Sequence, residues 1–265
     1  MKYTKAQREK LIDERAKVLL DYGFSGAEAE TIMEAAINTN LLFHSSGSIR
    51  SKLANLGGYG FSKEEVRKIV LEAPAVLSFA EESVNSKLKN YEAYGFSKEE
   101  VRKLVLGSRS AVEYAEKSVN SKLRNLEAYG FSRAEVRKIV LGVPAALGCA
   151  KKSVNSKLRN LEKTRTFHNG FAMTLDNRKV RKLILSFPSV LSFSEHTLGW
   201  KMRTMAVITE GEKQEMLEMG KHWMQSARKS VARAQYLKRN GKDNRYPKDV
   251  FLSAKRFERK YRVSL

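Results

Sequence analysis

The chain has one cysteine, four prolines and four histidines in 265 residues, and these shortages exclude several classes of protein. A single cysteine cannot form an internal disulfide, so a disulfide framework is excluded and we expect a reduced compartment. One cysteine and four dispersed histidines offer too few ligands for a structural zinc site, so we expect no metal. The apolar runs are short and interrupted by Lys, Arg or Glu. They fall well below the ~20 residues that cross a bilayer, so we expect no membrane segment.

Catalytic motifs are missing as well. The sequence contains no HExxH zinc motif, no GxxxxGK[ST] phosphate loop and no GxSxG nucleophile elbow. The four histidines are scattered along the chain, at His44, His168, His196 and His222. The paired glutamates are explained by helix starts, where acidic groups are favourable. We therefore expect no enzyme, no cofactor and no small-molecule substrate.

Acidic residues are few relative to basic ones. The chain carries 50 Lys and Arg against 29 Asp and Glu, which gives a formal net charge of +21 at pH 7. Hydrophobic residues make up 42% of the chain and aromatic residues 9%, enough to bury a core, so we do not expect wholesale disorder. A folded protein with this excess of positive charge is suited to a polyanionic partner.

The sequence repeats itself with a period of 35 residues, which is typical of a helical solenoid. Tyr-Gly-Phe-Ser occurs at Tyr59–Ser62, Tyr94–Ser97 and Tyr129–Ser132, and Ser-Val-Asn-Ser-Lys-Leu occurs at Ser83–Leu88, Ser118–Leu123 and Ser153–Leu158. A looser copy precedes these from Tyr22, and another follows around Val180 after an insertion of nine residues. We number the five copies repeats 1 to 5. The insertion is placed within 163–177, where Asn169-Gly170 is a turn signal.

The first half of each repeat predicts a helix, which we call helix A. In repeat 2, Ser62 is a helix-capping residue, and Glu65 follows it three residues later. Val66, Ile69 and Val70 then fall on a single helical face. This face must be buried against a neighbouring element.

The second half of each repeat predicts a turn and a second helix, helix B. Pro74 ends helix A because proline disfavours helical geometry in the residue before it, so 75–79 should be a tight turn or 3₁₀ segment. Helix B is predicted over 81–94, with Gly95 as a left-handed cap. No such hairpin is stable alone, so neighbours must stack. The predicted fold class is an all-α superhelical solenoid of stacked helical hairpins with short 3₁₀ turns.

The order of these motifs resembles the repeat of the mitochondrial transcription termination factor (mTERF) family. Gly-Phe-Ser is followed by Glu-x-Val-Arg-Lys-Ile-Val-Leu, then Pro-x-Val-Leu, then a Ser- or Glu-led helix with Lys-Leu, most closely over Tyr59–Met205. Tyr246-Pro247, Leu252-Ser253 and Arg256–Tyr261 resemble the family's closing motif. The resemblance implies a left-handed superhelix that binds double-stranded nucleic acid, typically DNA, in transcription termination or organelle gene expression.

Two rows of basic residues recur at fixed positions and are the predicted nucleic-acid contacts. The helix A row contains Arg67, Lys68, Arg102, Lys103, Arg137, Lys138, Arg181 and Lys182, and the helix B row contains Lys87, Lys89, Lys122, Arg124, Lys157, Arg159, Lys201 and Arg203. Stacking places equivalent residues in register, so each row can follow a phosphate backbone. The alternative for a single pair is a solvated face beside glutamates. The excess charge of the whole chain favours binding.

Repeats 2 to 4 differ mainly in one window, which reads Glu72–Phe79, Gly107–Tyr114 and Gly142–Cys149 in turn. The candidate specificity residues in this window are Ser78, Arg109, Glu113 and Gly148, of which Arg109 stands where the mTERF family has proline. Neutral drift in an inter-helix turn explains the same variation, because loops tolerate change.

Three parts are predicted along the chain. An N-terminal cap with the degenerate repeat 1 covers 1–54, the central repeats with the insertion near 163–177 cover 55–205, and a basic helical cap covers 206–265. The aromatic residues of the last part are Trp223, Tyr236, Tyr246, Phe251, Phe257 and Tyr261. Core packing is favoured over base stacking for most of them.

The predicted partner is double-stranded DNA, bound by a monomer along its backbone in transcription termination or regulation. An RNA-binding protein and a protein-binding α-solenoid scaffold are the alternatives, although a scaffold would not need a charge of +21. The expected compartment is reduced and contains nucleic acid. It is the mitochondrial matrix by the family resemblance, or a bacterial cytoplasm.

Overall fold

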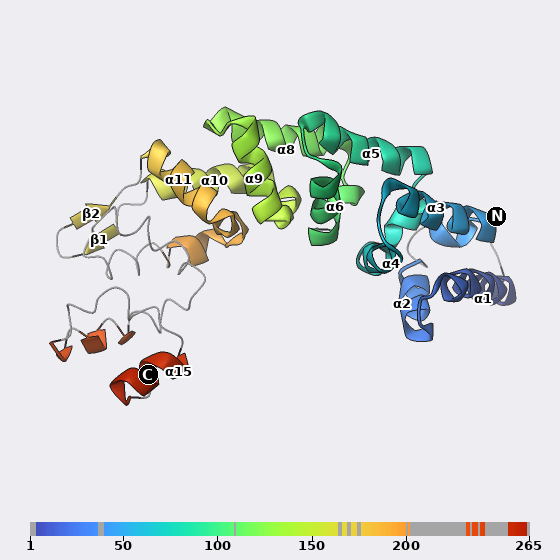
Figure 1. Ribbon diagram of the computed structural model, residues 1–265, viewed down its shortest axis with the longest axis horizontal. Helices are drawn as coiled ribbons and strands as arrows, with labels where there is room; N and C mark the ends of the chain where they lie inside the picture. The colour runs from blue at the N-terminus through green and yellow to red at the C-terminus, as the bar shows by residue number, and fades with distance from the viewer. Residues whose placement is uncertain are drawn as a thin grey trace. The chain divides into compact units, whose positions relative to one another are not determined.

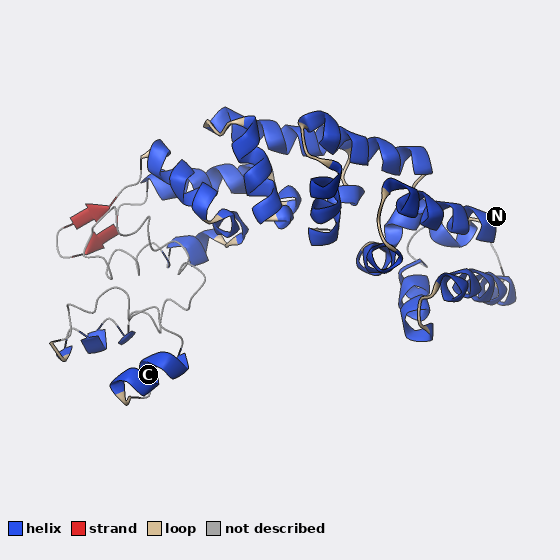
Figure 2. Ribbon diagram, viewed as in Figure 1, coloured by secondary structure: helices blue, strands red, loops and turns tan. Residues whose placement is uncertain are grey.

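The computed structural model describes residues 4–36, 40–108, 110–163, 166–168, 171–173, 176–199, 201, 232–233, 235–237, 239–241 and 254–263. The chain forms two compact units, the N-terminal unit Met1–Arg124 and the C-terminal unit Asn125–Leu265. Helices joined by short turns make up nearly all of the described residues (Figures 1 and 2).

The N-terminal unit begins with α1 (Lys5–Tyr22) and continues with the hairpins of repeats 1 to 3. Repeat 1 comprises α2 (Gly26–Ala36), the 3₁₀ helix η1 (Asn40–Phe43) and α3 (Ser46–Tyr59); repeat 2 comprises α4 (Lys63–Glu72), η2 (Pro74–Ser78) and α5 (Glu81–Tyr94); repeat 3 comprises α6 (Lys98–Gly107), α7 (Ser110–Glu113) and α8 (Glu116–Tyr129). The residues of α8 from 125 onward belong to the C-terminal unit.

The C-terminal unit contains repeats 4 and 5. Repeat 4 comprises α9 (Arg133–Gly142), η3 (Pro144–Gly148) and α10 (Lys151–Lys163); the strands β1 (Thr166–His168) and β2 (Phe171–Met173) follow; repeat 5 comprises α11 (Asn177–Ser186), η4 (Pro188–Ser192) and helical residues 195–199; and α15 (Ala254–Tyr261) lies near the C terminus. The predicted all-α fold of stacked hairpins with short 3₁₀ turns is confirmed.

Local sequence signals set the element boundaries. The Ser62 hydroxyl caps α4 in a capping box with Glu65, and Pro74 occupies the first turn of η2. Gly95 ends α5 with a φ of 106°, in the left-handed region that glycine tolerates best. Repeat 3 has no proline at this position, and its turn is a short α-helix, α7, instead of a 3₁₀ helix.

The insertion contains a small element that the sequence reading did not include. β1 and β2 pair antiparallel, with His168 opposite Phe171. The two residues between these ends of the ladder are Asn169 and Gly170, the dipeptide that most strongly favours a two-residue hairpin. The turn signal therefore belongs to a β-hairpin inserted between two helical repeats.

The core of each unit is built from the apolar faces of stacked helices. In repeat 2, Val66 and Val70 of α4, Leu77 of η2 and Leu88 of α5 are each fully buried. Within the N-terminal unit α4 packs against α2 and α6, and within the C-terminal unit α11 packs against α9 and α10. Each hairpin thus covers the apolar face of the next, as the stacking argument requires.

Near the C terminus the described aromatic residues pack on one another, as predicted. Phe257 is completely buried, and its ring centroid lies 4.7 Å from that of Tyr261 and 6.0 Å from that of Tyr236. Trp223, Tyr246 and Phe251 lie outside the described residues. The division into 1–54, 55–205 and 206–265 stays a prediction.

Candidate nucleic-acid interface

The helix A arginines bind the preceding repeat. The Nη2 atoms of Arg67, Arg102 and Arg181 donate to the Oε2 atoms of Glu28, Glu65 and Glu135 at 2.7, 2.6 and 2.9 Å, respectively. The arginine side chains are only 31–33% exposed and the glutamates 26–28%. Each pair joins two neighbouring A helices, so these arginines hold repeats together.

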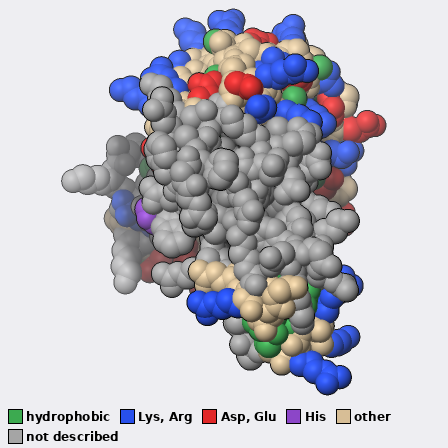
Figure 3. Space-filling model, turned by 90° about the vertical axis from the view of Figure 1, so that its left-hand side faces the viewer, with side chains coloured by type: hydrophobic (Ala, Val, Ile, Leu, Met, Phe, Trp, Pro, Cys, Tyr) green, Lys and Arg blue, Asp and Glu red, His purple; other side chains and the backbone are tan. Residues whose placement is uncertain are grey.

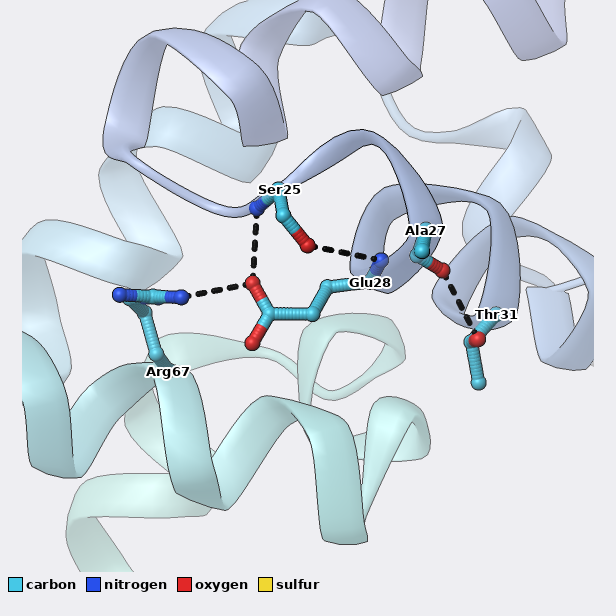
Figure 4. A network of polar contacts seen from close by, with 5 residues as sticks. All are labelled: Ser25, Ala27, Glu28, Thr31 and Arg67. Carbon is cyan, nitrogen blue, oxygen red and sulfur yellow. Dashed lines mark hydrogen bonds and ion pairs between the residues drawn. The ribbon is translucent and has the colours of Figure 1, made fainter.

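The glutamate of each pair also starts its own helix. Figure 4 shows the arrangement in repeat 1, where the backbone N–H of Ser25 and the guanidinium of Arg67 both donate to Oε2 of Glu28 at 2.7 Å. The backbone N–H of Glu28 donates back to the Ser25 hydroxyl at 3.3 Å. The Ser25 N–H and the Arg67 guanidinium hold the pKa of Glu28 below its usual value. One carboxylate thus completes a capping box and an ion pair between repeats.

The same arrangement is found around Glu65. Burial alone would raise the pKa of Glu65, but the Ser62 N–H and the Arg102 guanidinium hold it below its usual value. The carboxylate is therefore ionised at neutral pH and remains a strong acceptor for Arg102.

This series of ion pairs has two different ends. Repeat 1 has Glu30 at the position of the arginines, and repeat 5 has Lys179 at the position of the glutamates. In repeat 5 the helix is instead capped by Asp176, whose Oδ1 accepts the Lys179 backbone N–H at 2.8 Å. Repeat 1 therefore has the acceptor glutamate but no donor arginine. Repeat 5 has the donor arginine but no acceptor glutamate.

The helix A lysines face solvent instead. The side chains of Lys68, Lys103, Lys138 and Lys182 are all exposed. Lys68 has an acidic neighbour one turn later, with 3.8 Å between its Nζ and Oε1 of Glu72. The two residues of a predicted Arg-Lys pair therefore have different roles: the arginine has a structural role and the lysine lies at the surface. Arg137 is half-buried like the other arginines.

The first lysine of each helix B pair is turned inward. Nζ of Lys52, Lys87 and Lys157 donates to the backbone oxygens of Leu77, Val112 and Leu191 at 2.8, 2.8 and 2.7 Å. Each of these oxygens belongs to the turn of the following repeat. Burial lowers the pKa of Lys87 and of Lys201. These lysines bind backbone carbonyls of the neighbouring short helices, which helix termini leave without an intrahelical partner.

An aromatic ring covers several of these lysines. Nζ lies 3.9 Å from the ring centroid for Lys87 over Phe79, 3.9 Å for Lys122 over Tyr114 and 4.9 Å for Lys201 over Phe193. These distances are within the range of cation–π attraction. In repeat 1 the equivalent position is His44, whose Nδ1 lies 3.1 Å from Nζ of Lys52. In repeat 4 it is Cys149, which is half-buried.

The second residue of each helix B pair points outward. Lys89, Arg124 and Arg159 are exposed. Arg203 lies outside the described residues. The helix B row is thus divided in the same way as the helix A row, into inward lysines and outward cations.

Asparagine pairs join the B helices, and the sequence reading did not identify them. The side-chain amides of Asn55 and Asn85 exchange two hydrogen bonds of 3.1 and 2.9 Å. Asn90 pairs with Asn120 at 3.0 and 2.9 Å, and Asn125 pairs with Asn155 at 2.7 and 3.0 Å. The signal was present, because the two asparagines recur at fixed positions in every close repeat.

The variable window contributes to the contacts between repeats. Its carbonyls accept from the inward lysines, and its last residue packs on the lysine of its own repeat, as Phe79 and Tyr114 show. Ser78 and Glu113 are half-buried, Gly148 is exposed and Arg109 lies outside the described residues. A role of these residues in sequence choice stays a prediction.

Further exposed cations were missed by the sequence reading. Lys151 and Lys152 at the start of α10 and Arg178 in α11 are exposed. By contrast, Lys63 and Lys98 at the starts of α4 and α6 lie over the rings of Tyr22 and Tyr59, with Nζ 5.6 and 5.1 Å from the centroids.

The described residues show no candidate membrane-spanning helix and no candidate metal site. None of their helices is both long enough and apolar enough to cross a membrane. They contain no group of three or more His, Cys, Asp or Glu side chains placed to hold a metal ion.

Comparison with protein-family models gives a match. A family model described as mTERF matches residues 3–168, which is more than half of the chain. No curated protein matches the chain.

Proposed function

Because the chain belongs to the mTERF family of nucleic-acid-binding helical repeat proteins, we propose that it binds double-stranded DNA along the phosphate backbone. The proposed role is in transcription termination or regulation, where a protein wrapped on the template obstructs the polymerase. The expected bound form is a monomer.

The observation that carries this proposal is the outward cation at the same place in successive repeats. Lys138 and Lys182 are exposed on α9 and α11, which pack against each other, and Arg159 is exposed on α10. The arginine that precedes Lys182, Arg181, forms an ion pair with Glu135. The outward lysines do not share that role, so a regular series of cations is available to phosphates.

The aromatic side chains favour a duplex over a single strand. Proteins that bind single strands stack bases on exposed aromatic rings. In the described part of this chain the only large hydrophobic side chains with high exposure are Leu20 and Phe43. The rings of Phe79, Tyr114 and Phe193 are occupied by lysines of their own repeats. The part of the surface that the structure describes thus offers charge for a backbone and few exposed rings on which bases could stack.

Binding of the full chain to a duplex DNA oligonucleotide over a series of salt concentrations tests the proposal. If five to eight phosphates are neutralised, the slope of log affinity against log salt should be about −4.5 to −7. Duplex RNA and single-stranded DNA of the same sequence serve as comparison ligands, and a transcription template with the bound site gives the termination readout. A flat salt response, or no binding at low salt, refutes the proposal and favours a protein-binding scaffold. Tighter binding to RNA would transfer the proposal to that ligand.

A further inference from the structure

The net charge of the chain is divided unequally between its two units. The N-terminal unit, Met1–Arg124, has 20 Lys and Arg against 17 Asp and Glu, a net charge of +3. The C-terminal unit, Asn125–Leu265, has 30 against 12, a net charge of +18. Nearly all of the excess positive charge therefore lies in the C-terminal unit.

The same asymmetry is built into one face of helix A. The second, sixth and tenth residues of this helix are four apart, so they lie along one side of it. We call them the helix A stripe; it comprises Glu64, Lys68 and Glu72 in α4, Glu99, Lys103 and Gly107 in α6, Ala134, Lys138 and Gly142 in α9, and Arg178, Lys182 and Ser186 in α11. All twelve residues are exposed.

The charge of the stripe rises by one with each repeat. The central lysine is constant, while acids before and after it disappear one by one, so the formal charge is −1 in α4, 0 in α6, +1 in α9 and +2 in α11. In α4 the lysine is partly neutralised, since Glu72 lies 3.8 Å from Lys68. The lysine in α11 instead has Arg178 one turn before it.

Helix B shows the same trend with different residues. The exposed charged residues are Glu82, Lys89 and Glu92 in α5, Lys117 and Arg124 in α8, and Lys151, Lys152 and Arg159 in α10. Their formal charges give −1, +2 and +3 in chain order. In the face shown in Figure 3, Lys and Arg predominate among the charged side chains of the described surface.

We infer that phosphate binding is graded from repeat to repeat along the chain, with its main contact on Lys138, Arg159 and Lys182 of α9, α10 and α11. The acids of the helix A stripe in α4 and α6 weaken it toward the N terminus. This inference rests on the proposed function, because the ligand is the same duplex backbone. The physical reason is that each phosphate contact requires a cation whose charge is not already balanced by a neighbouring carboxylate. The C-terminal unit therefore binds the duplex backbone more strongly than the N-terminal unit.

Matched variants of the full chain test the gradient against the same DNA duplex. The double variant Lys138→Ala with Lys182→Ala should flatten the salt slope by about 1.8 and lower affinity by up to about 60-fold at 0.1 M salt, since each lost contact removes about 0.9 from the slope. The control variant, Lys68→Ala with Lys103→Ala, removes the equivalent lysines of the helix A stripe in the N-terminal unit. It should change the slope by less than about half as much.

A third variant tests the role of the acids. Glu64→Ala with Glu72→Ala removes the two carboxylates around Lys68, and it should strengthen binding and steepen the slope by up to about 0.9. The gradient is overturned if the two double-lysine variants lose equal affinity, or if removing the two glutamates does not increase affinity. Either result leaves DNA binding itself in place. Absence of salt-dependent binding by the unaltered protein overturns the proposed function and the gradient together. Circular dichroism of each variant verifies that the helices are intact.

Discussion

The ion pairs between A helices give a sharp test of the structure, because neighbouring residues in one helix are assigned opposite roles. Arg102 donates to Glu65 of the preceding repeat at 2.6 Å, and both side chains are mostly buried. Lys103, the next residue, is exposed. Arg102→Ala should therefore lower the stability of the protein, whereas Lys103→Ala should leave it unchanged.

The expected cost of Arg102→Ala follows from the kind of bond that is lost. A hydrogen bond to a charged group contributes about 1.5–3 kcal/mol, and exposed ion pairs contribute about 0–1 kcal/mol. Side chains that are 32% and 26% exposed lie between these cases, so we expect a loss of about 1–2 kcal/mol. Each kcal/mol corresponds to a fall in Tm of roughly 2–4 °C for a protein of this size.

Acid pH supplies an internal control. The pKa of Glu65 is below its usual value in the folded protein, so its contribution to stability is present above the unfolded pKa of about 4.5 and is lost as pH falls through the folded pKa. The difference in Tm between Arg102→Ala and the parent should shrink over that range. Thermal unfolding followed by circular dichroism at neutral and acid pH measures both effects. Equal destabilisation by Arg102→Ala and Lys103→Ala, or none by either, would refute the assigned roles.

Two further predictions concern packing and protonation. Gly142→Ala should destabilise the protein, because a Cβ there would lie 2.8 Å from Cγ of Pro188. Gly58→Ala should stabilise it by up to about 1 kcal/mol, because a Cβ there meets nothing within 4 Å. A change in Tm of the same sign for both variants would contradict the packing of η4 on α9. Burial and the nearby Lys52 ammonium lower the pKa of His44, so stability should fall as pH drops below about 6.5, where the unfolded chain takes up the proton first. His44→Phe, which copies the residue at this position in repeats 2 and 5, should remove that dependence in urea titrations between neutral and mildly acid pH, and an unchanged profile would show that another group titrates.

Much of the fold could be predicted because its signals are local. A capping serine with an acid three residues later, Pro74 and Gly95 mark the two helices of a repeat, and the structure has these helices at Lys63–Glu72 and Glu81–Tyr94. The β-hairpin was missed although its turn dipeptide was noted. Strand pairs of three residues carry almost no periodic pattern to recognise.

The candidate site was only partly predictable, for a physical reason. Arg102 and Lys103 are adjacent and chemically alike, so composition and charge cannot separate them. What separates them is the glutamate of the preceding repeat, Glu65, which is brought near only by stacking. The same holds for Lys87 and Lys89, since the carbonyl that binds Lys87 belongs to the next repeat. The asparagine pairs, by contrast, recur at one separation of 30 residues, so the sequence pattern could have revealed them.

The two unlike ends of the ion-pair series bear on how such a protein changes length over evolutionary time. Each interior repeat brings both a glutamate for its successor and an arginine for its predecessor, so an in-frame gain or loss of one repeat by unequal recombination leaves every junction chemically complete. The ends do not share this freedom. A copy added before repeat 1 would bring a glutamate against Glu30, and a copy added after repeat 5 would bring an arginine against Lys179, so like charges would meet at both new junctions. The number of repeats can therefore change without bringing like charges together only when a repeat is gained or lost in the interior of the array.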